Sequence, residues 1–143
     1  MQIYAKPPES ETKALLAACG LPTEDLEAEH FEHFFGCGRK DSPSGVVGIE
    51  VHGAAALLRS LAVAENSRGI GCGRRLIAEA EAHAARLGIT EIYLLTNTAA
   101  SLFKSLGYAV VARESAPTAI RATKEFSALC PASATFMVKR IVA

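Results

Sequence analysis

A strand, a glycine-rich loop and an amphipathic helix follow one another between residues 57 and 76, and this order constrains the fold more than any other part of the chain. The segment reads LLRSLAVAENSRGIGCGRRL, with Gly69, Gly71 and Gly73 at alternate positions of the loop. Glycine lets the main chain turn tightly and lets a ligand approach it closely. The first amides of the following helix lack partners within the helix, and the helix dipole adds positive potential there. The loop is therefore typical of a phosphate-binding site.

The residues around the glycines exclude two common phosphate-binding fingerprints. A P-loop requires Gly-Lys-Ser or Gly-Lys-Thr, but Gly73 is followed by Arg74 and Arg75. A dinucleotide-binding fingerprint requires a third glycine where this chain has Arg74. Arginine side chains bind phosphate oxygens well, so the loop is still compatible with phosphate binding. A plain glycine-rich turn before a helix is the alternative interpretation.

Hydrophobic periodicity and turn residues predict alternating strands and helices along the chain. The clearest helix covers residues 73–87, because its apolar residues share one face and Gly88 follows its end. The apolar residues of that face are Leu76, Ile77, Ala80, Ala84 and Leu87. We expect strands at 2–6, 30–40, 46–51, 54–63, 89–95, 108–112 and 135–142, further helices at 9–19, 23–26, 99–106 and 117–124, and a turn at 41–45. This alternation indicates an α/β (α+β) fold in which helices cover both faces of a mixed sheet.

Length and composition narrow the class of protein. A chain of 143 residues predicts one domain over residues 1–143, and a hydrophobic fraction of 50% excludes disorder. The 15 basic and 15 acidic residues give no excess of positive charge, which argues against a general nucleic-acid binder. The most apolar run, residues 54–64, contains Arg59 and is too short to cross a bilayer. The first six residues lack the apolar core of a secretory signal. We therefore expect a cytoplasmic protein with no nucleic-acid or membrane partner.

The cysteines are widely spaced and form no C-x-x-C pair. They are Cys19, Cys37, Cys72 and Cys130. This spacing resembles neither a zinc module nor a disulfide framework, so we expect reduced thiols. His30, His33 and Cys37 offer three ligands in an awkward register on a predicted strand, so we expect no metal site. Cys130 could bind a soft ligand such as trivalent arsenic, and packing in the core is its alternative role.

Two motifs resemble those of the GNAT acetyltransferase superfamily. Residues 68–73, Arg-Gly-Ile-Gly-Cys-Gly, match the R-x-x-G-x-G loop that binds the pyrophosphate of acyl-CoA in that superfamily. Residues 99–108 resemble its second motif, a helix that ends in Leu-Gly-Tyr. The segments 94–96, 106–108, 116–126 and 129–134 resemble a subgroup named arsenic-resistance N-acetyltransferases. The resemblance implies a GNAT-like, mostly antiparallel mixed sheet of about six to seven strands.

The resemblance also implies where acetyl-CoA would lie. Main-chain groups of Leu61, Ala62 and Val63 would face the pantetheine arm and the acetyl carbonyl, where an amide can stabilise an oxyanion. Asn97 and Phe103 would lie along the far side of the arm. The loop residues that would hold the pyrophosphate are Arg68, Gly69, Ile70, Gly71, Cys72, Gly73 and Arg74.

The superfamily transfers the acetyl group directly to an amine, which requires a base and an acid. Many members carry a tyrosine acid where this chain has Phe103, which cannot donate a proton. Tyr108 is therefore the candidate acid, with Tyr93 as a second candidate and solvent as the alternative.

The candidate base also departs from the superfamily pattern. Many members carry an acidic residue where this chain has Arg59. Glu50, on the neighbouring predicted strand, is therefore the candidate base, with His52 behind it. An exposed charge on the solvent face of a strand is the alternative role of Glu50.

Arg59 lies inside an apolar strand and needs a negatively charged partner. That partner is either an internal carboxylate or an anionic group of the substrate. In the second case Ser60, Arg121, Thr123 and Glu125 would line the same pocket, and a solvated helix face is the alternative for the last three.

The predicted function is that of an N-acetyltransferase with acetyl-CoA as cosubstrate and no metal. The acceptor would be a small, anionic, amino-acid-like amine, such as a glutamate-like compound or an arsenic or phosphorus analogue. A non-catalytic acyl-CoA-binding module and a protein or peptide N-acetyltransferase are the alternatives. The last predicted strand could pair within the chain or across a homodimer.

Overall fold

The computed structural model describes residues 2–129 and 133–141, which form two compact units. The first unit comprises Met1–Glu50 and Leu58–Ala84, and the second comprises Val51–Leu57 and Ala85–Ala143. Seven strands follow one another in the sheet order β1-β2-β3-β4-β5-β7-β6. The pairs β1–β2, β2–β3, β5–β7 and β6–β7 are antiparallel, whereas β4 and β5 are parallel. The predicted mixed, mostly antiparallel sheet is confirmed, and the single domain over residues 1–143 stays a prediction.

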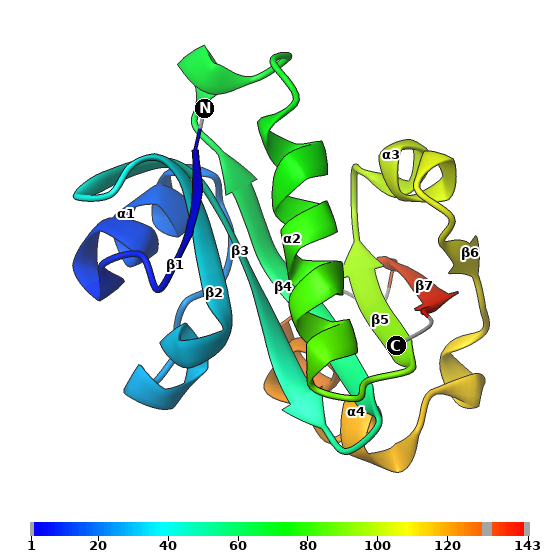
Figure 1. Cartoon of the computed structure of the whole chain (residues 1–143). Helices are drawn as coiled ribbons and strands as arrows, with labels where there is room; N and C mark the ends of the chain where they lie inside the picture. The colour runs from blue at the N-terminus through cyan, green and yellow to red at the C-terminus, as the bar shows by residue number, and fades with distance from the viewer. Residues whose placement is uncertain (1, 130–132, 142–143) are drawn as a thin grey trace. The chain divides into compact units, whose positions relative to one another are not determined.

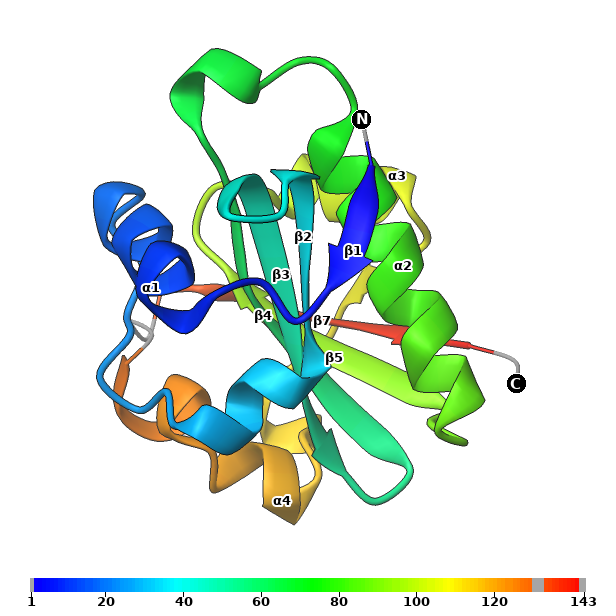
Figure 2. The ribbon, with the colours of Figure 1, turned by 60° about the vertical axis from the view of Figure 1, so that its left-hand side comes forward.

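The first unit places helices on both faces of its strands. Its elements are β1 (Ile3–Ala5), α1 (Glu9–Ala18), the 3-10 helix η1 (Ala28–His33), β2 (Phe34–Arg39), the 3-10 helix η2 (Glu65–Ser67) and most of β3 (Ser42–His52), β4 (Ala55–Val63) and α2 (Cys72–Arg86). Val46 packs in one core cluster with Leu16 of α1. Its neighbour Gly45 faces the other side, where a Cβ would lie 3.1 Å from Leu76 of α2. Accordingly, Figure 2 shows α1 and α2 on opposite sides of β2 and β3.

The second unit has a core of its own, to which the last strand, β7, contributes. Its elements are β5 (Glu91–Thr96), α3 (Ala100–Ser105), β6 (Ala109–Val110), the 3-10 helix η3 (Arg113–Ser115), α4 (Thr118–Arg121), the π-helix η4 (Glu125–Leu129) and β7 (Thr135–Arg140). Strand β7 pairs with β5 from Thr135 to Arg140 and with β6 at Met137 and Val138, as Figure 1 shows. Phe136 stacks on Tyr93 with ring centroids 5.4 Å apart and packs with Ile120 of α4. The last strand therefore pairs within the chain, and a homodimer stays a prediction.

Three predicted elements and one residue of a predicted apolar helix face differ from the structure. The predicted helix 23–26 is a turn, because the helical segment begins at Ala28 after Glu27 caps it. The predicted strand 30–40 begins only at Phe34, since that 3-10 helix occupies residues up to His33. The predicted turn 41–45 is mostly strand, because a register shift after Cys37 lets β3 start at Ser42. The predicted apolar residue Leu87 is 46% exposed, since α2 ends before it.

The prediction of reduced thiols is wrong for Cys37 and Cys72, which form a disulfide. Cys37 of β2 is paired across the strands with Gly45, which has no side chain. A Cβ at Gly45 would lie 2.6 Å from the Cys72 sulfur, so the glycine provides the room in which the two sulfurs meet. Cys19 is a free thiol. The predictions for Cys130 lie outside the described residues.

Within the described residues, every helix is too short or too polar to cross a membrane.

Candidate functional site

The glycine loop (residues 68–73) has the backbone that its glycines predict. Gly69 and Gly71 have φ angles of +82° and +87°, a left-handed conformation that favours glycine. A Cβ built at either position would meet no atom within 4 Å, so the main chain at both residues borders open space. Helix α2 begins at Cys72, and the amide of Arg75 donates to Gly71 O at 3.1 Å. The amides of Cys72 and Gly73 precede this bond and have no acceptor inside the helix.

Arg68 ties the glycine loop back to strand β4. Its Nε donates to the carbonyl oxygen of Val63 at 3.0 Å, although the side chain is exposed. The disulfide fixes the other end of the loop, since Cys72 is bonded to Cys37 of β2. Ile70 lies at the exposed tip between the two attachments, with 63% of its surface accessible. The loop is therefore held at both ends while its middle faces solvent.

Strand β4 is irregular just before the residues predicted to face acetyl-CoA. Ser60 has a φ angle of +59°, which costs a residue with a side chain about 1–3 kcal/mol. The strand continues through Leu61, Ala62 and Val63, of which Ala62 packs into the core on the α1 side. The left-handed residue therefore sets the direction of the main chain that follows it.

Arg59 is buried and holds two carboxylates. Its Nη1 donates to Asp25 Oδ2 at 2.5 Å and to Glu50 Oε1 at 2.6 Å, while its Nη2 donates to Asp25 Oδ1 at 2.9 Å. Its Nε donates to Ser60 Oγ at 3.0 Å. The side chains of Arg59, Asp25 and Glu50 are 1%, 7% and 11% exposed. The partner of Arg59 is therefore a pair of internal carboxylates, and we name Asp25, Glu50, Arg59 and Ser60 the arginine cluster.

The environment of Asp25 favours its charged form. Burial alone would raise the pKa of Asp25, but hydrogen bonds and the positive charge from Arg59 outweigh it and hold that pKa below its ordinary value. A hydrogen bond from its own backbone and the charge of His30 act in the same direction. The ionised carboxylate is therefore the form that the cluster stabilises.

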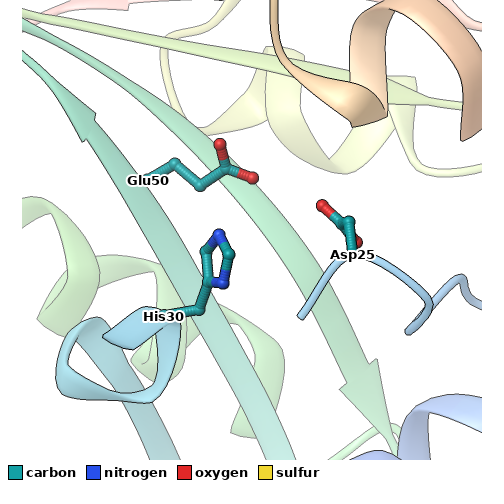
Figure 3. A group of neighbouring side chains, drawn as sticks. All are labelled: Asp25, His30 and Glu50. Atoms are coloured by element: carbon teal, nitrogen blue, oxygen red, sulfur yellow. The ribbon is translucent and has the colours of Figure 1, made fainter. Parts of the chain in front are cut away.

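His30 completes the surroundings of the two carboxylates. Figure 3 shows Asp25, His30 and Glu50 pointing toward one another, and their ligand atoms lie within 4.8 Å of each other. Nδ1 of His30 accepts a hydrogen bond from the backbone of Glu27 at 2.9 Å, so Nε2 carries the proton of the neutral ring. Although such a group can bind a metal ion, Arg59 already supplies the positive charge that both carboxylates need. We assign no metal to this group.

Asp25 is a member of the arginine cluster that the sequence analysis did not identify. The arginine in an apolar strand indicated a negatively charged partner, either an internal carboxylate or a group of the substrate, but it did not indicate which. Asp25 lies in Thr-Glu-Asp-Leu, a pattern that also fits a capped helix, and that interpretation hid its role. Its pairing with Arg59 joins residues 34 positions apart, so no local pattern could have shown it.

The candidate acids lie in the second unit and are buried. Phe103 and Tyr108 are each 3% exposed and meet edge to face, with ring centroids 5.3 Å apart. Lys139 Nζ lies 5.6 Å from the centre of the Tyr108 ring. Burial and neighbouring Glu91 raise the pKa of Tyr93 above its ordinary value, against the opposing charge of Arg140. Tyr93 therefore keeps its proton at neutral pH. Asn97, a predicted contact of the pantetheine arm, follows the end of β5 and is exposed.

The C-terminal residues predicted to bind substrate also belong to the second unit. Thr123 and Glu125 are 7% and 6% exposed, so the alternative of a solvated helix face is wrong for both. Thr123 Oγ1 donates to Ile120 O at 2.7 Å, which caps the end of α4. Arg121 donates to main-chain carbonyls of Ala116 and Glu114, each at 3.3 Å. Their predicted pocket with Arg59 stays a prediction, as does the role of the half-buried His52.

Comparisons with known proteins identify the family. The model of the acetyltransferase (GNAT) domain matches residues 30–110. An uncharacterized N-acetyltransferase of Chlorobaculum tepidum is 36% identical over 93 residues, which cover 64% of this chain and 59% of that protein. N-acetylglutamate synthase from Neisseria gonorrhoeae, solved with coenzyme A and N-acetyl-glutamate, superposes with a TM-score of 0.84 at 16% identity, over 99% of this chain and 35% of that chain. PaiA N-acetyltransferase from Thermoplasma acidophilum, solved with coenzyme A, gives a TM-score of 0.67 at 16% identity, over 99% and 100% of the two chains.

The chain thus spans about three-fifths of the length of its curated relative and about a third of the synthase chain. The matched domain includes the glycine loop, Arg59, Glu50 and His30. Because the family model covers more than half of the sequence, the chain belongs to the GNAT acetyltransferase family.

Proposed function

We propose that the protein is an N-acetyltransferase that uses acetyl-CoA as its cosubstrate. One observation carries the proposal: two left-handed glycines border open space immediately before helix α2. Main-chain amides at such a helix start bind phosphate oxygens. The exposed side chains of Arg68 and Arg74 add positive charge at the same place, which suits the pyrophosphate of coenzyme A. The two coenzyme A complexes of family members support this assignment.

Strand β4 would receive the acyl end of acetyl-CoA in this proposal. Leu61, Ala62 and Val63 lie between the left-handed Ser60 and the glycine loop, so their main chain would run along the pantetheine arm. An amide of this stretch would stabilise the oxyanion when the amine attacks the thioester. Asn97 and Phe103 remain the proposed contacts on the other side of the arm.

Two tyrosines and one glutamate are the proposed groups for proton transfer. Tyr93 is protonated at neutral pH and can donate to the leaving thiolate, and buried Tyr108 is the other proposed donor. Glu50 is the proposed base, although its Oε1 already accepts a hydrogen bond from Arg59. This ion pair favours a second candidate function, a module that binds acyl-CoA without turnover.

The acceptor in this proposal is a small amino-acid-like amine. The N-acetylglutamate synthase neighbour supports an acidic amino acid. Arg59, which the sequence suggested for the anionic group, is neutralised by Asp25 and Glu50. Arg121 is then the arginine proposed to meet a substrate carboxylate. An arsenic or phosphorus analogue of glutamate belongs to the same class, and the likeness to the arsenic-resistance subgroup is part of this proposal.

Calorimetric titration with acetyl-CoA tests the cosubstrate. We expect micromolar binding by the wild type and none by Gly71→Glu, because the carboxylate would fill the open space that the pyrophosphate needs. Gly88→Glu is the matched control: Gly88 follows the other end of α2, has a φ of +82° and also borders open space. Absence of binding in the wild type, or equal loss in both variants, would contradict the proposal.

Release of the coenzyme A thiol tests turnover and acceptor class. We expect turnover with free glutamate or aspartate and slower turnover with glutamine or asparagine, which differ only in charge. Faster turnover with peptides would indicate a peptide N-acetyltransferase instead. Binding of acetyl-CoA without turnover on any acceptor would favour the non-catalytic module.

A further inference from the structure

Ser60 has a backbone that its own side chain disfavours, inside a strand that the proposed function needs. Its φ of +59° lies in the left-handed region, and among the described residues other than glycine only Lys6 shares this feature. Such a conformation persists only when the surrounding structure over-determines it. The residues around Ser60 must therefore supply the constraint.

The arginine cluster supplies that constraint. Arg59 Nε donates to Ser60 Oγ, so the guanidinium is bonded directly to the side chain of the left-handed residue. The same guanidinium is fixed by Asp25 through two hydrogen bonds and by Glu50 through a third. Since a planar guanidinium with these bonds cannot rotate without breaking several at once, Arg59 is fixed in position and orientation.

The two carboxylates are anchored independently of β4. Glu50 belongs to β3, and Asp25 lies in the turn that precedes η1. The capping box of η1 follows this turn directly and holds it. In this box the His30 side chain accepts a hydrogen bond from the Glu27 backbone, and the Glu27 side chain accepts one from the His30 backbone. Two separate segments of the first unit, β3 and the turn before η1, therefore converge on one side chain of β4.

We propose that Arg59, held by Asp25 and Glu50, is a positioning residue that keeps Ser60 left-handed and so aims the main chain of residues 61–63 at the acetyl group. This inference rests on the proposed acetyl-CoA site. It gives Arg59 a role without contact with substrate, and it explains why a charged side chain is buried next to that stretch.

Substitutions at Asp25 and Ser60 test the inference together. Asp25→Asn weakens the hold on Arg59, so we expect acetyl-CoA affinity to fall at least about tenfold, because displaced main-chain groups no longer match the ligand. Adding Ser60→Gly should restore the affinity, because glycine adopts a positive φ without constraint. Adding Ser60→Ala should not restore it, since alanine keeps the penalty and loses the hydroxyl that Arg59 binds. The pair of double variants thus separates backbone conformation from loss of a hydrogen bond.

A second readout needs no ligand. The three-bond coupling between the amide and α protons of Ser60, with its Cα chemical shift, reports φ directly. We expect both to move toward extended values in Asp25→Asn. Met137→Ala, a buried substitution in β7, is the control for general destabilisation and should leave both unchanged.

The outcomes separate this inference from the proposed function. If the wild type binds acetyl-CoA and Asp25→Asn binds equally well, or if the two double variants bind alike, the positioning role is overturned while the acetyl-CoA site stands. If the wild type fails to bind acetyl-CoA, the proposed function and this inference fall together, whatever the coupling shows. If acetyl-CoA affinity falls in Asp25→Asn and is restored by adding Ser60→Gly but not by adding Ser60→Ala, the result supports both the acetyl-CoA site and the positioning role.

Discussion

The glycine loop and the arginine cluster lie on either side of residues 61–63 of β4 in the sequence. They differ in how far apart their own residues lie along the chain. The loop is local: six consecutive residues carry its glycines, its arginine and the start of α2. The cluster joins residues 25, 50, 59 and 60, which come from a turn and two strands. The exposed Gly69, Ile70 and Gly71 of the loop can be changed without disturbing the core, whereas the cluster is buried beside the core. We therefore expect loop substitutions to act on binding and cluster substitutions to act on folding as well.

The largest expected effect is that of Arg59→Met on stability. Methionine leaves two buried carboxylates without their positive partner, and breaking a buried ion pair from one side costs about 3–5 kcal/mol. Gly71→Glu should cost less, about 1–3 kcal/mol from the positive φ of Gly71, since its side chain would meet only open space. Urea unfolding at neutral pH gives both free energies of unfolding. Equal losses in the two variants would contradict the division between a binding loop and a folding cluster.

The disulfide is the next largest test, because it joins the start of α2 to β2. Cys37 and Cys72 close a loop of 35 residues, for which chain entropy predicts a contribution of about 3–4 kcal/mol. We expect dithiothreitol, or the double variant Cys37→Ser/Cys72→Ser, to lower the free energy of unfolding by that order. Cys19→Ser is the matched control, since that thiol is free. An unchanged midpoint under reducing conditions would show that packing alone holds the end of the loop.

The contribution of Asp25 to the acid response should be smaller than the two effects above. The pKa of Asp25 is lower in the folded protein than its ordinary value of 3.8. The stability that Asp25 contributes is therefore fully present above the ordinary value and is lost as pH falls through the lower, folded value. Urea unfolding at a series of pH values should show a shallower acid-induced loss in Asp25→Asn than in the wild type or Gly71→Glu. Parallel pH curves for all three would show that Asp25 is not held in its charged form.

The same contrast explains what the sequence could predict. Helix α2, the strand before it and the glycine loop follow local rules, so their bounds and left-handed glycines were accessible from residue order. The fold class also followed from the alternation of predicted strands and helices and from the two motifs at residues 68–73 and 99–108. The need of Arg59 for a charged partner followed from its apolar surroundings, but the choice between substrate and protein did not.

Two features depended on tertiary structure that no local pattern contains. The pairing of Cys37 with Cys72 depends on the side chain missing at Gly45, which no cysteine spacing shows. The left-handed Ser60 lies in a run of apolar residues that reads as an ordinary strand. The disulfide and the positive φ of Ser60 both depend on neighbours distant in sequence. They could therefore be identified only from the strand register and the burial of side chains in the structure.

The smallest expected effect is at the exposed ion pair Lys6–Glu32. It provides the reference against which the stability loss in the buried arginine cluster is compared. Its atoms lie 3.0 Å apart, about as close as those of the arginine cluster, but its side chains are 63% and 61% exposed. Water and salt screen such a pair, so Glu32→Gln should change the free energy of unfolding by less than about 0.5 kcal/mol. The variant exchanges a carboxylate for an amide, as Asp25→Asn does, in the same unit and at a similar distance from its cation. Burial is then the main difference between the two substitutions. If Glu32→Gln costs as much as Asp25→Asn in urea unfolding, distance rather than burial controls these ion pairs, and the special status of the arginine cluster is lost.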